Sequence, residues 1–452
     1  MTKPITLLLT LFSITAIPLL AEKKPMNVVV MLSDDWRYDT LGAAGNPIVK
    51  TPHLDKLAAN GVHFTHACVT TSICGVSRAS IMTGQWMSRH GNKGFKGFNT
   101  PWSETYPGIL RAQGYHTGHV GKWHCGKFPA KNFDYGKSYS GRHWIKDENG
   151  NKIHVTAKNL KDSMEFLDKR PKDKPFLLNL CFFASHAEDP NPKQYLPQEH
   201  SMKLYTDVSI PNPVLRSDAA FKNLPPFLQD ERNEGRVRYG WRFTTDESFQ
   251  TMMKNYYRLC TEVDEVCGKI VERLNKEGEL ENTLIIFIGD NGYFHGDRKL
   301  ADKWYPYEES IRVPLIVFDP RIPRGKRGQK NDEYALNVDL APTILKALGL
   351  QIPQGVQGED LSRLYLGDND TKWRTEFFYE HATISNKHRI PYSEAVVSKT
   401  LKYTWWPEWQ HEELYDLTKD PLEQKNLVEN PAYQEQLKQI RAKHKVMAAR
   451  AK

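Results

Sequence analysis

The 452-residue chain lacks long apolar runs beyond its first 21 residues, and it lacks internal repeats and low-complexity tracts. A membrane-spanning helix needs about 20 consecutive apolar residues, so we expect no span in the mature chain. The chain contains 39% hydrophobic and 11% aromatic residues, which is typical of a globular protein. Its length predicts roughly two domains, or one large domain with an appendage.

The one apolar run stands at the N-terminus and has the pattern of a Sec signal peptide. Lys3 precedes an almost wholly apolar segment, residues 5–20, and Ala21 stands before charged residues that begin with Glu22. This order of charge, apolar segment and small residue predicts cleavage after Ala21. No cysteine stands at the cleavage site, so a lipid anchor is not indicated. We therefore expect a periplasmic or secreted protein.

Cysteine is also scarce, with six residues in the whole chain. An oxidising compartment would allow disulfides. Cys260 and Cys267, however, lie seven residues apart on one face of a predicted helix, about 10 Å along its axis, which is too far for a bridge. We expect at most one disulfide.

The stretch from Thr71 to Gly84 has the strongest chemical signal. Cys74 precedes Arg78 by four residues, and Ser77 to Met82 form a predicted short helix that ends at Gly84. Cys74 then lies at or just before a helix N-terminus, where the backbone favours an anion, and Arg78 can fold back toward it. That setting favours a reactive thiol, although a small buried cysteine is an equally good explanation of the local pattern.

Four continuous apolar runs predict the central strands of a mostly parallel sheet between helices, an α/β fold. Ionisable or amide side chains follow each run, at the strand ends that form the ligand crevice of such sheets. The runs and these side chains are residues 26–32 with Asp34 and Asp35, 115–120 with Lys122 and His124, 176–183 with His186, and 283–288 with Asp290 and Asn291.

Two of these strand ends predict a metal site. Asp34, Asp35, Asp290 and Asn291 offer three carboxylates and one amide carbonyl. Oxygen ligands of this kind favour calcium or magnesium over zinc. The sequence does not choose between those two ions.

Domain boundaries follow from changes in pattern. We predict a catalytic domain over residues 22–360, including an amphipathic helix at 251–276 and long loops at 187–250. Asp339 is expected to cap a following helix. From residue 361 to 452, short alternating segments and a final helix from Ala432 predict a C-terminal α+β subdomain with an antiparallel sheet.

Cys74 and Arg78, followed by Ala-Ser-Ile-Met-Thr-Gly, closely resemble the signature of type I, formylglycine-dependent sulfatases of the alkaline phosphatase-like superfamily. The resemblance runs from about Asn27 to Leu427, and it includes Gly-Lys-Trp-His at 121–124. It implies that a sulfatase-maturing enzyme oxidises Cys74 to formylglycine, whose hydrate attacks sulfur through one hydroxyl and expels sulfate through the other. Val76 departs from the usual Pro or Ala, and Arg298 stands where the family often has histidine.

The same resemblance implies roles for individual residues. One calcium ion is bound at the four predicted ligand positions and at residue 74. Lys122 and Lys303 contact the sulfate, His124 holds the formylglycine hydroxyl, and His186 lies near the leaving-group oxygen. Arg78 belongs to the signature itself.

The implied function is an exported, open-cleft sulfatase that acts on a sulfated carbohydrate, similar to bacterial carbohydrate sulfatases and iduronate-sulfatase-like enzymes. The net charge of +8 favours an anionic partner, though not nucleic acid, and solubility alone explains it equally well. A phosphomonoester or phosphonate hydrolase of the same superfamily, and an inactive polyanion-binding protein, are the alternatives. Candidates for holding anionic sugar groups are Arg142, His143, Lys387, His388 and Arg389.

Overall fold

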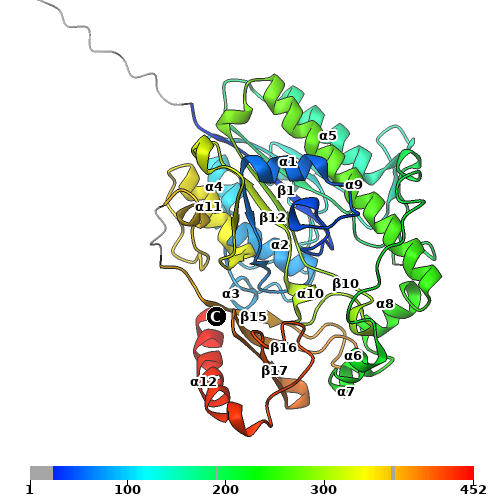
Figure 1. Ribbon diagram of the computed structural model, residues 1–452. Helices are drawn as coiled ribbons and strands as arrows, with labels where there is room; N and C mark the ends of the chain where they lie inside the picture. The colour runs from blue at the N-terminus through cyan, green and yellow to red at the C-terminus, as the bar shows by residue number, and fades with distance from the viewer. Residues whose placement is uncertain (1–23, 190, 368–371) are drawn as a thin grey trace, which may run out of the picture.

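An eight-stranded mixed sheet runs through the larger part of the protein (Figure 1). The computed structural model describes residues 24–189, 191–367 and 372–452. The predicted signal peptide, residues 1–21, lies outside the described residues and stays a prediction. Among the described residues, no helix has the length and apolarity to cross a membrane.

The sheet has the strand order β13-β2-β12-β9-β1-β8-β4-β5, and its central strands β9, β1, β8 and β4 are parallel. The predicted mostly parallel sheet is therefore confirmed. Only β12 runs antiparallel to its two neighbours. The strands are β1 (Asn27–Ser33), β2 (Val62–Phe64), β4 (His116–Gly121), β5 (Tyr135–Ser138), β8 (Phe176–Cys181), β9 (Thr283–Gly289), β12 (Leu315–Phe318) and β13 (Gln329–Asn331).

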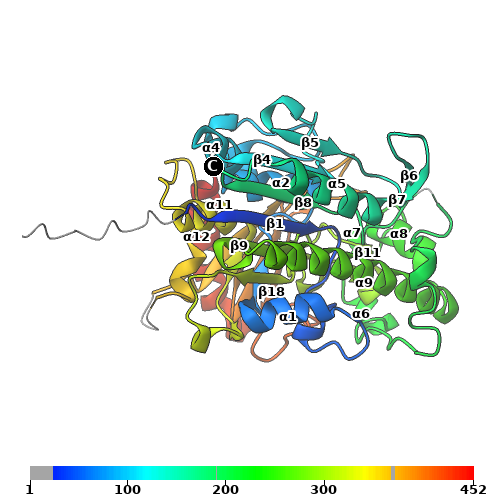
Figure 2. The same ribbon diagram turned by 90° about the horizontal axis from the view of Figure 1, so that it is seen from above.

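Helices cover both faces of this sheet, because its central strands are apolar on both sides. In β1, Val29 and Met31 pack under one helical layer, whereas Val28, Val30 and Leu32 pack under the other. Figure 1 shows one layer above the strands and the other below them, and Figure 2 looks down on the first layer. The first layer contains α1 (Pro52–Asn60), α5 (Val155–Lys169) and α9 (Asp246–Lys276), and the second contains α2 (Cys74–Thr83), α4 (Tyr106–Ala112) and α11 (Leu340–Ala347).

Two helices begin earlier than predicted. α9 extends the predicted helix at 251–276 back to Asp246, because Thr245 and Ser248 form a reciprocal capping box at its N-terminus. α2 begins at Cys74 rather than Ser77 and ends, as predicted, before Gly84, which has a φ of 67°. Cys74 is thus the first residue of the helix.

The segment 187–250 is not only loops, as the sequence predicted. It contains α6 (Asp218–Lys222), α7 (Pro226–Gln229) and α8 (Glu234–Arg242). Asn233 caps α8 by accepting a hydrogen bond from the Gly235 N–H. These helices were missed because they are short, so no apolar period of helical length marks them, and α6 and α8 also carry several charges.

The C-terminal part is the predicted antiparallel sheet. Its four strands follow one another in chain order: β15 (Glu376–His381), β16 (Ser393–Ser398), β17 (Leu401–Trp406) and β18 (His411–Asp416). One face packs against the larger part through Phe377 and Tyr379, and α12 (Gln434–Ala451) covers the other face (Figure 1). Leu361 still packs in the core of the larger part, so the domain boundary at residue 360 stays a prediction, and the packing favours a later one.

Short elements complete the connections. They are α3 (Met87–His90), α10 (Glu308–Ile311), β3 (Ala67–Cys68), β6 (Trp144–Lys146), β7 (Lys152–His154), β10 (Phe294–His295), β11 (Ala301–Asp302) and β14 (Ala335–Leu336). All six cysteines are buried and unpaired. Asp339 precedes α11 without capping it. Its carboxylate accepts instead from the backbone N–H groups of Leu336 and Glu359.

One buried carboxylate joins the two parts. Glu413 of β18 is 1% exposed and accepts hydrogen bonds from Trp406 Nε1 at 2.8 Å, Tyr415 OH at 2.6 Å and Tyr307 OH at 2.9 Å. Tyr307 belongs to the larger part. Loss of this acceptor leaves three buried donors without a partner, and each unsatisfied group is costly.

Glu413→Ala should therefore lower the free energy of unfolding by on the order of 3–5 kcal/mol. The measurement is urea unfolding followed by tryptophan fluorescence. Glu412→Ala is the matched control, because the neighbouring Glu412 is only partly buried and pairs with Arg441, so its loss should cost about 1 kcal/mol or less. Equal losses in the two variants would contradict this account of the junction.

Candidate active site

The acidic strand ends lie next to each other because β1 and β9 are neighbours in register, Ser33 opposite Gly289. The Asp35 N–H points to Asp290 Oδ1 at 3.3 Å, and Asn291 Nδ2 donates to Asp35 Oδ1 at 2.6 Å. Asp34, Asp35, Asp290 and Asn291 are all 0% exposed. The predicted convergence of these four side chains is found in the structure.

Three cations surround the three carboxylates. Lys122 forms an ion pair with Asp34, and Lys303 Nζ lies 2.6 Å from Asp35 Oδ1. Arg78 Nε lies 2.8 Å from Asp290 Oδ2, and an Arg78 terminal nitrogen lies 3.2 Å from Asp34 Oδ2. The hydrogen bonds of Arg78 go to these carboxylates and to two backbone carbonyls rather than to Cys74, so its guanidinium holds two of the carboxylates in place.

Asp34 and Asp290 differ in their ionisation. Burial raises the pKa of Asp34, but Lys122, His186 and Arg78 outweigh burial and hold this pKa well below its usual value. For Asp290, burial and the negative charge of Asp34 outweigh Arg78 and raise the pKa to about 7. A further positive charge is therefore needed to keep Asp290 fully ionised at neutral pH.

The donor set fits a hard cation. Asp34 Oδ1, Asp35 Oδ2 and Asn291 Oδ1 are buried and have no hydrogen-bond partner among the described residues. Oxygens in this condition are costly unless a cation binds them. Three of the four predicted ligands thus each present one free oxygen, the chemistry that calcium or magnesium requires.

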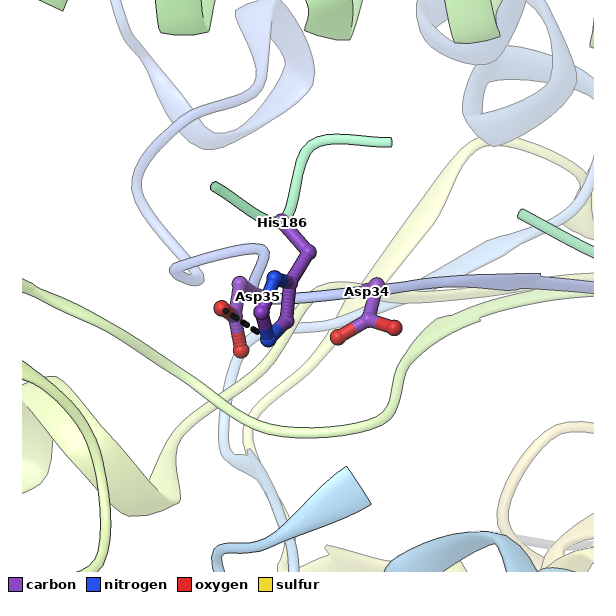
Figure 3. A group of neighbouring side chains, drawn as sticks. All are labelled: Asp34, Asp35 and His186. Carbon is purple, nitrogen blue, oxygen red and sulfur yellow. Dashed lines mark ion pairs between the residues drawn. The ribbon is translucent and has the colours of Figure 1, made fainter. Parts of the chain in front are cut away.

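His186 lies beside this oxygen cluster. One ligand atom each from Asp34, Asp35 and His186 falls within 4.8 Å of the others, as Figure 3 shows. The His186 Nε2 is 3.6 Å from Asp35 Oδ2. Its Nδ1 is 2.6 Å from the Ala187 carbonyl oxygen and donates to it, which leaves Nε2 as the atom available for chemistry.

Cys74 contacts a histidine, as the sequence led us to expect. Its Sγ is 3.0 Å from His124 Nδ1, and the Phe95 ring stacks on the His124 ring at 4.5 Å. Burial, reinforced by Lys122, lowers the pKa of His124 to about 2, so this imidazole is neutral. Burial also raises the pKa of Cys74 to about 11, although Lys122 opposes the shift. The unmodified thiol is therefore not activated, contrary to the reactive setting that the helix N-terminus predicted.

A cavity of about 440 Å³ opens onto these groups. Cys74, His124, His186 and Lys303 lie in its lining, together with the apolar side chains of Phe95 and Trp304, among others. A larger cavity of about 590 Å³ elsewhere, lined partly by Arg37 and Arg312, contains none of the predicted catalytic residues. The smaller cavity is therefore the candidate active site.

A further group of charged residues, which was not predicted from the sequence, lies next to Lys303. The fully buried Arg242 of α8 binds Asp302 Oδ2 at 2.9 Å and Asp189 Oδ1 at 2.5 Å. Asp302 lies 3.6 Å from Lys303 Nζ. Burial opposes ionisation of Asp302, but Arg242 and Lys303 outweigh burial and lower its pKa. A sequence signal did exist, since Asn233 followed by acidic Glu234 is typical of a helix start.

Of the five predicted substrate-binding residues, only Arg389 lines the cavity. Arg142 is exposed elsewhere, Lys387 lies over the Trp409 ring at 4.4 Å, and His388 lies 3.8 Å from Asp230. His143 is 0% exposed and stacks on His154, so its position gives no support to a substrate contact. Contacts from the other four to an anionic group stay predictions.

Comparison with known proteins shows the family to which the chain is similar. The sulfatase family description matches residues 26–350, and the description "N-sulphoglucosamine sulphohydrolase, C-terminal" matches residues 296–450. An arylsulfatase of Clostridium perfringens is 29% identical, with 92% of each chain covered. An N-acetylglucosamine-6-O-sulfatase of Bacteroides thetaiotaomicron is 27% identical, with 97% of this chain and 89% of that one covered.

The fold agrees with these matches. A solved structure in complex with its substrate, D-glucosamine-2-N,6-O-disulfate, has a TM-score of 0.79 at 23% identity and covers 95% of this chain and 98% of that one. The family description spans the sheet, the strand ends and Cys74. The protein therefore belongs to the sulfatase family, sulfuric ester hydrolases with the alkaline phosphatase-like fold.

Proposed function

We propose that the protein is an exported sulfatase that hydrolyses a sulfate ester on a carbohydrate, using formylglycine made from Cys74 and one bound calcium ion. The observation that carries the proposal is the position of Cys74. It begins α2 in the lining of the cavity, 3.0 Å from His124. Buried carboxylate and amide oxygens that have no hydrogen-bond partner in the described part of the chain lie at the adjoining strand ends.

The names of relatives support a sulfated amino sugar, as in glycosaminoglycan-like chains, as the substrate class. One relative is named an N-acetylglucosamine-6-O-sulfatase, and another was solved with a disulfated glucosamine. The partner that the proposal requires is a maturing enzyme acting on Cys74. Because Cys74 is buried in the folded protein, we infer that conversion precedes or accompanies folding.

Calcium is the better choice of metal on physical grounds. Its four proposed ligands are all 0% exposed, so the ion must exchange water for protein oxygens. Magnesium dehydrates reluctantly and usually keeps several waters, whereas calcium accepts six to eight oxygens in flexible geometry. Residue 74 stays a predicted fifth ligand.

Charge balance supports an anionic substrate. Asp34, Asp35 and Asp290 are matched by Arg78, Lys122 and Lys303, so the site is close to neutral without a metal. A divalent cation leaves a surplus of positive charge next to the cavity. That surplus would neutralise a sulfate ester and the charge that develops on its oxygens during cleavage.

The chain's own side chains then have separate tasks. As formylglycine, residue 74 would supply the hydroxyl nucleophile that cysteine lacks, and neutral His124 lies within hydrogen-bond distance of that position. Lys303, in the cavity lining, is placed to bind the sulfate oxygens. His186 holds its Nδ1 proton on the Ala187 carbonyl, so a second proton on Nε2 would be the one given to the departing alcohol.

The first prediction tests the nucleophile. Cys74→Ala should lower turnover of a sulfate ester by on the order of 10⁴-fold or more, because the reacting group is removed. Mass spectrometry of the tryptic peptide 57–78 should find residue 74 lighter than cysteine in active wild-type protein. Cys260→Ala, a buried cysteine of α9, is the matched control and should keep activity.

Substantial sulfatase activity in Cys74→Ala would contradict the assignment. An unconverted cysteine in fully active protein would contradict the formylglycine. The sulfate ester and the phosphate ester of one phenol, assayed in parallel, separate a sulfatase from a phosphomonoester hydrolase. We expect the enzyme to hydrolyse the sulfate ester faster.

The second prediction concerns pH and metal. Because the pKa of Asp290 is raised to about 7, a proton competes with calcium below that pH. Calcium affinity, measured by titration calorimetry, should fall about tenfold per pH unit below about pH 7 and level off above it. Without metal, the stability that Asp290 gains by staying protonated is fully present below about pH 4 and is lost as pH rises through about 7.

Asp290→Asn should bind calcium weakly and without this pH dependence. Asp264→Asn is the matched control, because burial raises the pKa of Asp264 to about 7 as well, but Asp264 binds the start of α1. The control should keep the wild-type calcium affinity. Equal affinity of the wild type at about pH 6 and about pH 8 would count against Asp290 as a ligand.

The third prediction separates the two histidines. Proton donation matters most when the leaving alcohol is a poor leaving group, such as a sugar hydroxyl, and least for nitrophenol. His186→Ala should lower kcat/KM for a sugar sulfate more than for nitrophenyl sulfate, by on the order of 10²-fold. His124→Ala should impair both substrates alike, because it acts on the nucleophile. If His186→Ala lowers kcat/KM equally for both substrates, His186 is not the proton donor, and Lys303 becomes the candidate for that role.

A further inference from the structure

A second hollow, of about 480 Å³, adjoins the active-site cavity. Residues of the same two segments line both: the segment 231–238, which includes the start of α8, and the loop 384–390 between β15 and β16. Arg389 belongs to the lining of the cavity and of the hollow. A group that is covalently attached to a ligand in the cavity can therefore reach the second hollow.

The contact between Glu234 and Arg389 holds the two segments together where the cavity and the hollow adjoin. The Glu234 N–H donates to the Arg389 carbonyl at 2.9 Å, and the two side chains form an ion pair. The loop also keeps its own shape, because the Ile384 N–H donates to the Ile390 carbonyl at 3.1 Å. The Arg389 N–H donates to the Asn386 carbonyl at 3.0 Å. Backbone hydrogen bonds thus fix the loop that carries half of the lining.

The lining of the second hollow is polar and carries more positive than negative groups. Two guanidinium groups, one imidazole, one amide and one carboxylate accompany a single apolar side chain. The lining residues are Glu231, Arg232, Val237, Asn386, His388 and Arg389.

Each guanidinium of this lining pairs with a carboxylate that is less exposed than itself. Arg232 lies 2.5 Å from Asp230 Oδ2, and the two side chains are 64% and 24% exposed. Arg389 pairs with Glu234, and these side chains are 41% and 8% exposed. A guanidinium has five N–H donors, and a carboxylate accepts two of them in a forked pair, so donors are left for another oxyanion.

These donors suit an acidic group on a sugar. Arginine binds carboxylate and similar planar or tetrahedral oxyanions through parallel, charge-assisted hydrogen bonds. A sulfated sugar held in the cavity brings its neighbour in the chain with it, so the neighbour binds in the adjoining hollow as part of the same molecule. Even a modest contact there adds to the affinity for a longer substrate.

Resting on the proposed function, we propose that the second hollow is a subsite for the neighbouring sugar of the substrate, where Arg232 and Arg389 bind an acidic group, a carboxylate or a sulfate, on that sugar. Arg232 is then a specificity-determining residue that contacts the substrate away from the reacting ester. The sequence analysis named His388 and Arg389 as candidates for such a role, but not Arg232. It stands in the charged run 230–234, which is typical of a solvated loop.

The experiment varies the neighbour of one sulfated sugar. A panel of monosaccharide sulfates first identifies the sugar that the matured enzyme accepts. That sugar is then linked, on its reducing or non-reducing side, to glucose, to glucuronic acid or to glucose 6-sulfate. On the better side, kcat/KM for sulfate release from the first sugar, followed by NMR, should be about fivefold higher with an acidic neighbour than with glucose. This preference should shrink as the salt concentration rises from about 0.01 M to about 1 M.

The outcomes separate the two proposals. No release of sulfate from any of these sugars would overturn the proposed function itself. Equal kcat/KM values with all three neighbours would overturn the subsite and leave the sulfatase assignment intact. A gain with only one of the two acidic neighbours supports the subsite and identifies whether it takes a carboxylate or a sulfate.

Variants of the lining test the subsite directly. Arg232→Ala should lower the preference for the acidic neighbour about threefold or more, whereas Arg232→Lys, which keeps the charge, should retain most of it. Glu231→Gln should raise the preference, because it removes the one carboxylate among the lining residues. A merely structural role would not move the two neighbouring positions in opposite directions.

Arg321→Ala is the matched control. Arg321 pairs with Asp319 two residues earlier, as Arg232 pairs with Asp230, but it lies in neither lining. The control should leave the preference unchanged. An unchanged preference in Arg232→Ala, or an equal change in the control, would overturn the role of Arg232.

Discussion

The burial of three carboxylates at the ends of two neighbouring strands is the constraint on which the rest of the site depends. Asp34, Asp35 and Asp290 are completely removed from solvent, and isolated buried charges of one sign are very costly. The fold compensates with cations from three other segments, which therefore must pack against the strand ends. Arg78 is one of them, and the helix that carries it also carries Cys74. Charge compensation thus fixes the position of Cys74 relative to the three carboxylates.

The C-terminal part contributes to this arrangement from a distance. The β10–β11 hairpin leads to Lys303, and Arg298 at its turn is 1% exposed. Arg298 donates to the Leu422 carbonyl at 2.7 Å and to the Glu423 carbonyl at 3.1 Å. The departure from the family histidine at this position therefore has a structural explanation here: the arginine anchors the hairpin to the C-terminal part. The same part supplies the loop 384–390 above the cavity.

The chemistry at residue 74 depends on burial rather than on the helix N-terminus alone. A thiol in this environment stays protonated, and the neighbouring His124 stays neutral. Neither group is poised for thiolate chemistry at neutral pH. An environment that suppresses the thiolate is compatible with a cysteine that serves as the precursor of another group, because the aldehyde hydrate needs a held hydroxyl and not a charged sulfur.

The sequence by itself determined the central strands, the acidic strand ends and the place of Cys74, because continuous apolar runs and the residues that follow them are local features. It also determined the C-terminal sheet. Only the tertiary structure decided that Arg78 binds Asp34 and Asp290, that His143 is buried against His154, and that Arg242 pairs with Asp302 next to Lys303. These are contacts between segments up to about two hundred residues apart, and their partners are set by how the helices and the 187–250 segment pack on the sheet. No local pattern encodes such a choice, because an arginine or histidine has the same sequence signature whether it faces a substrate or a buried carboxylate.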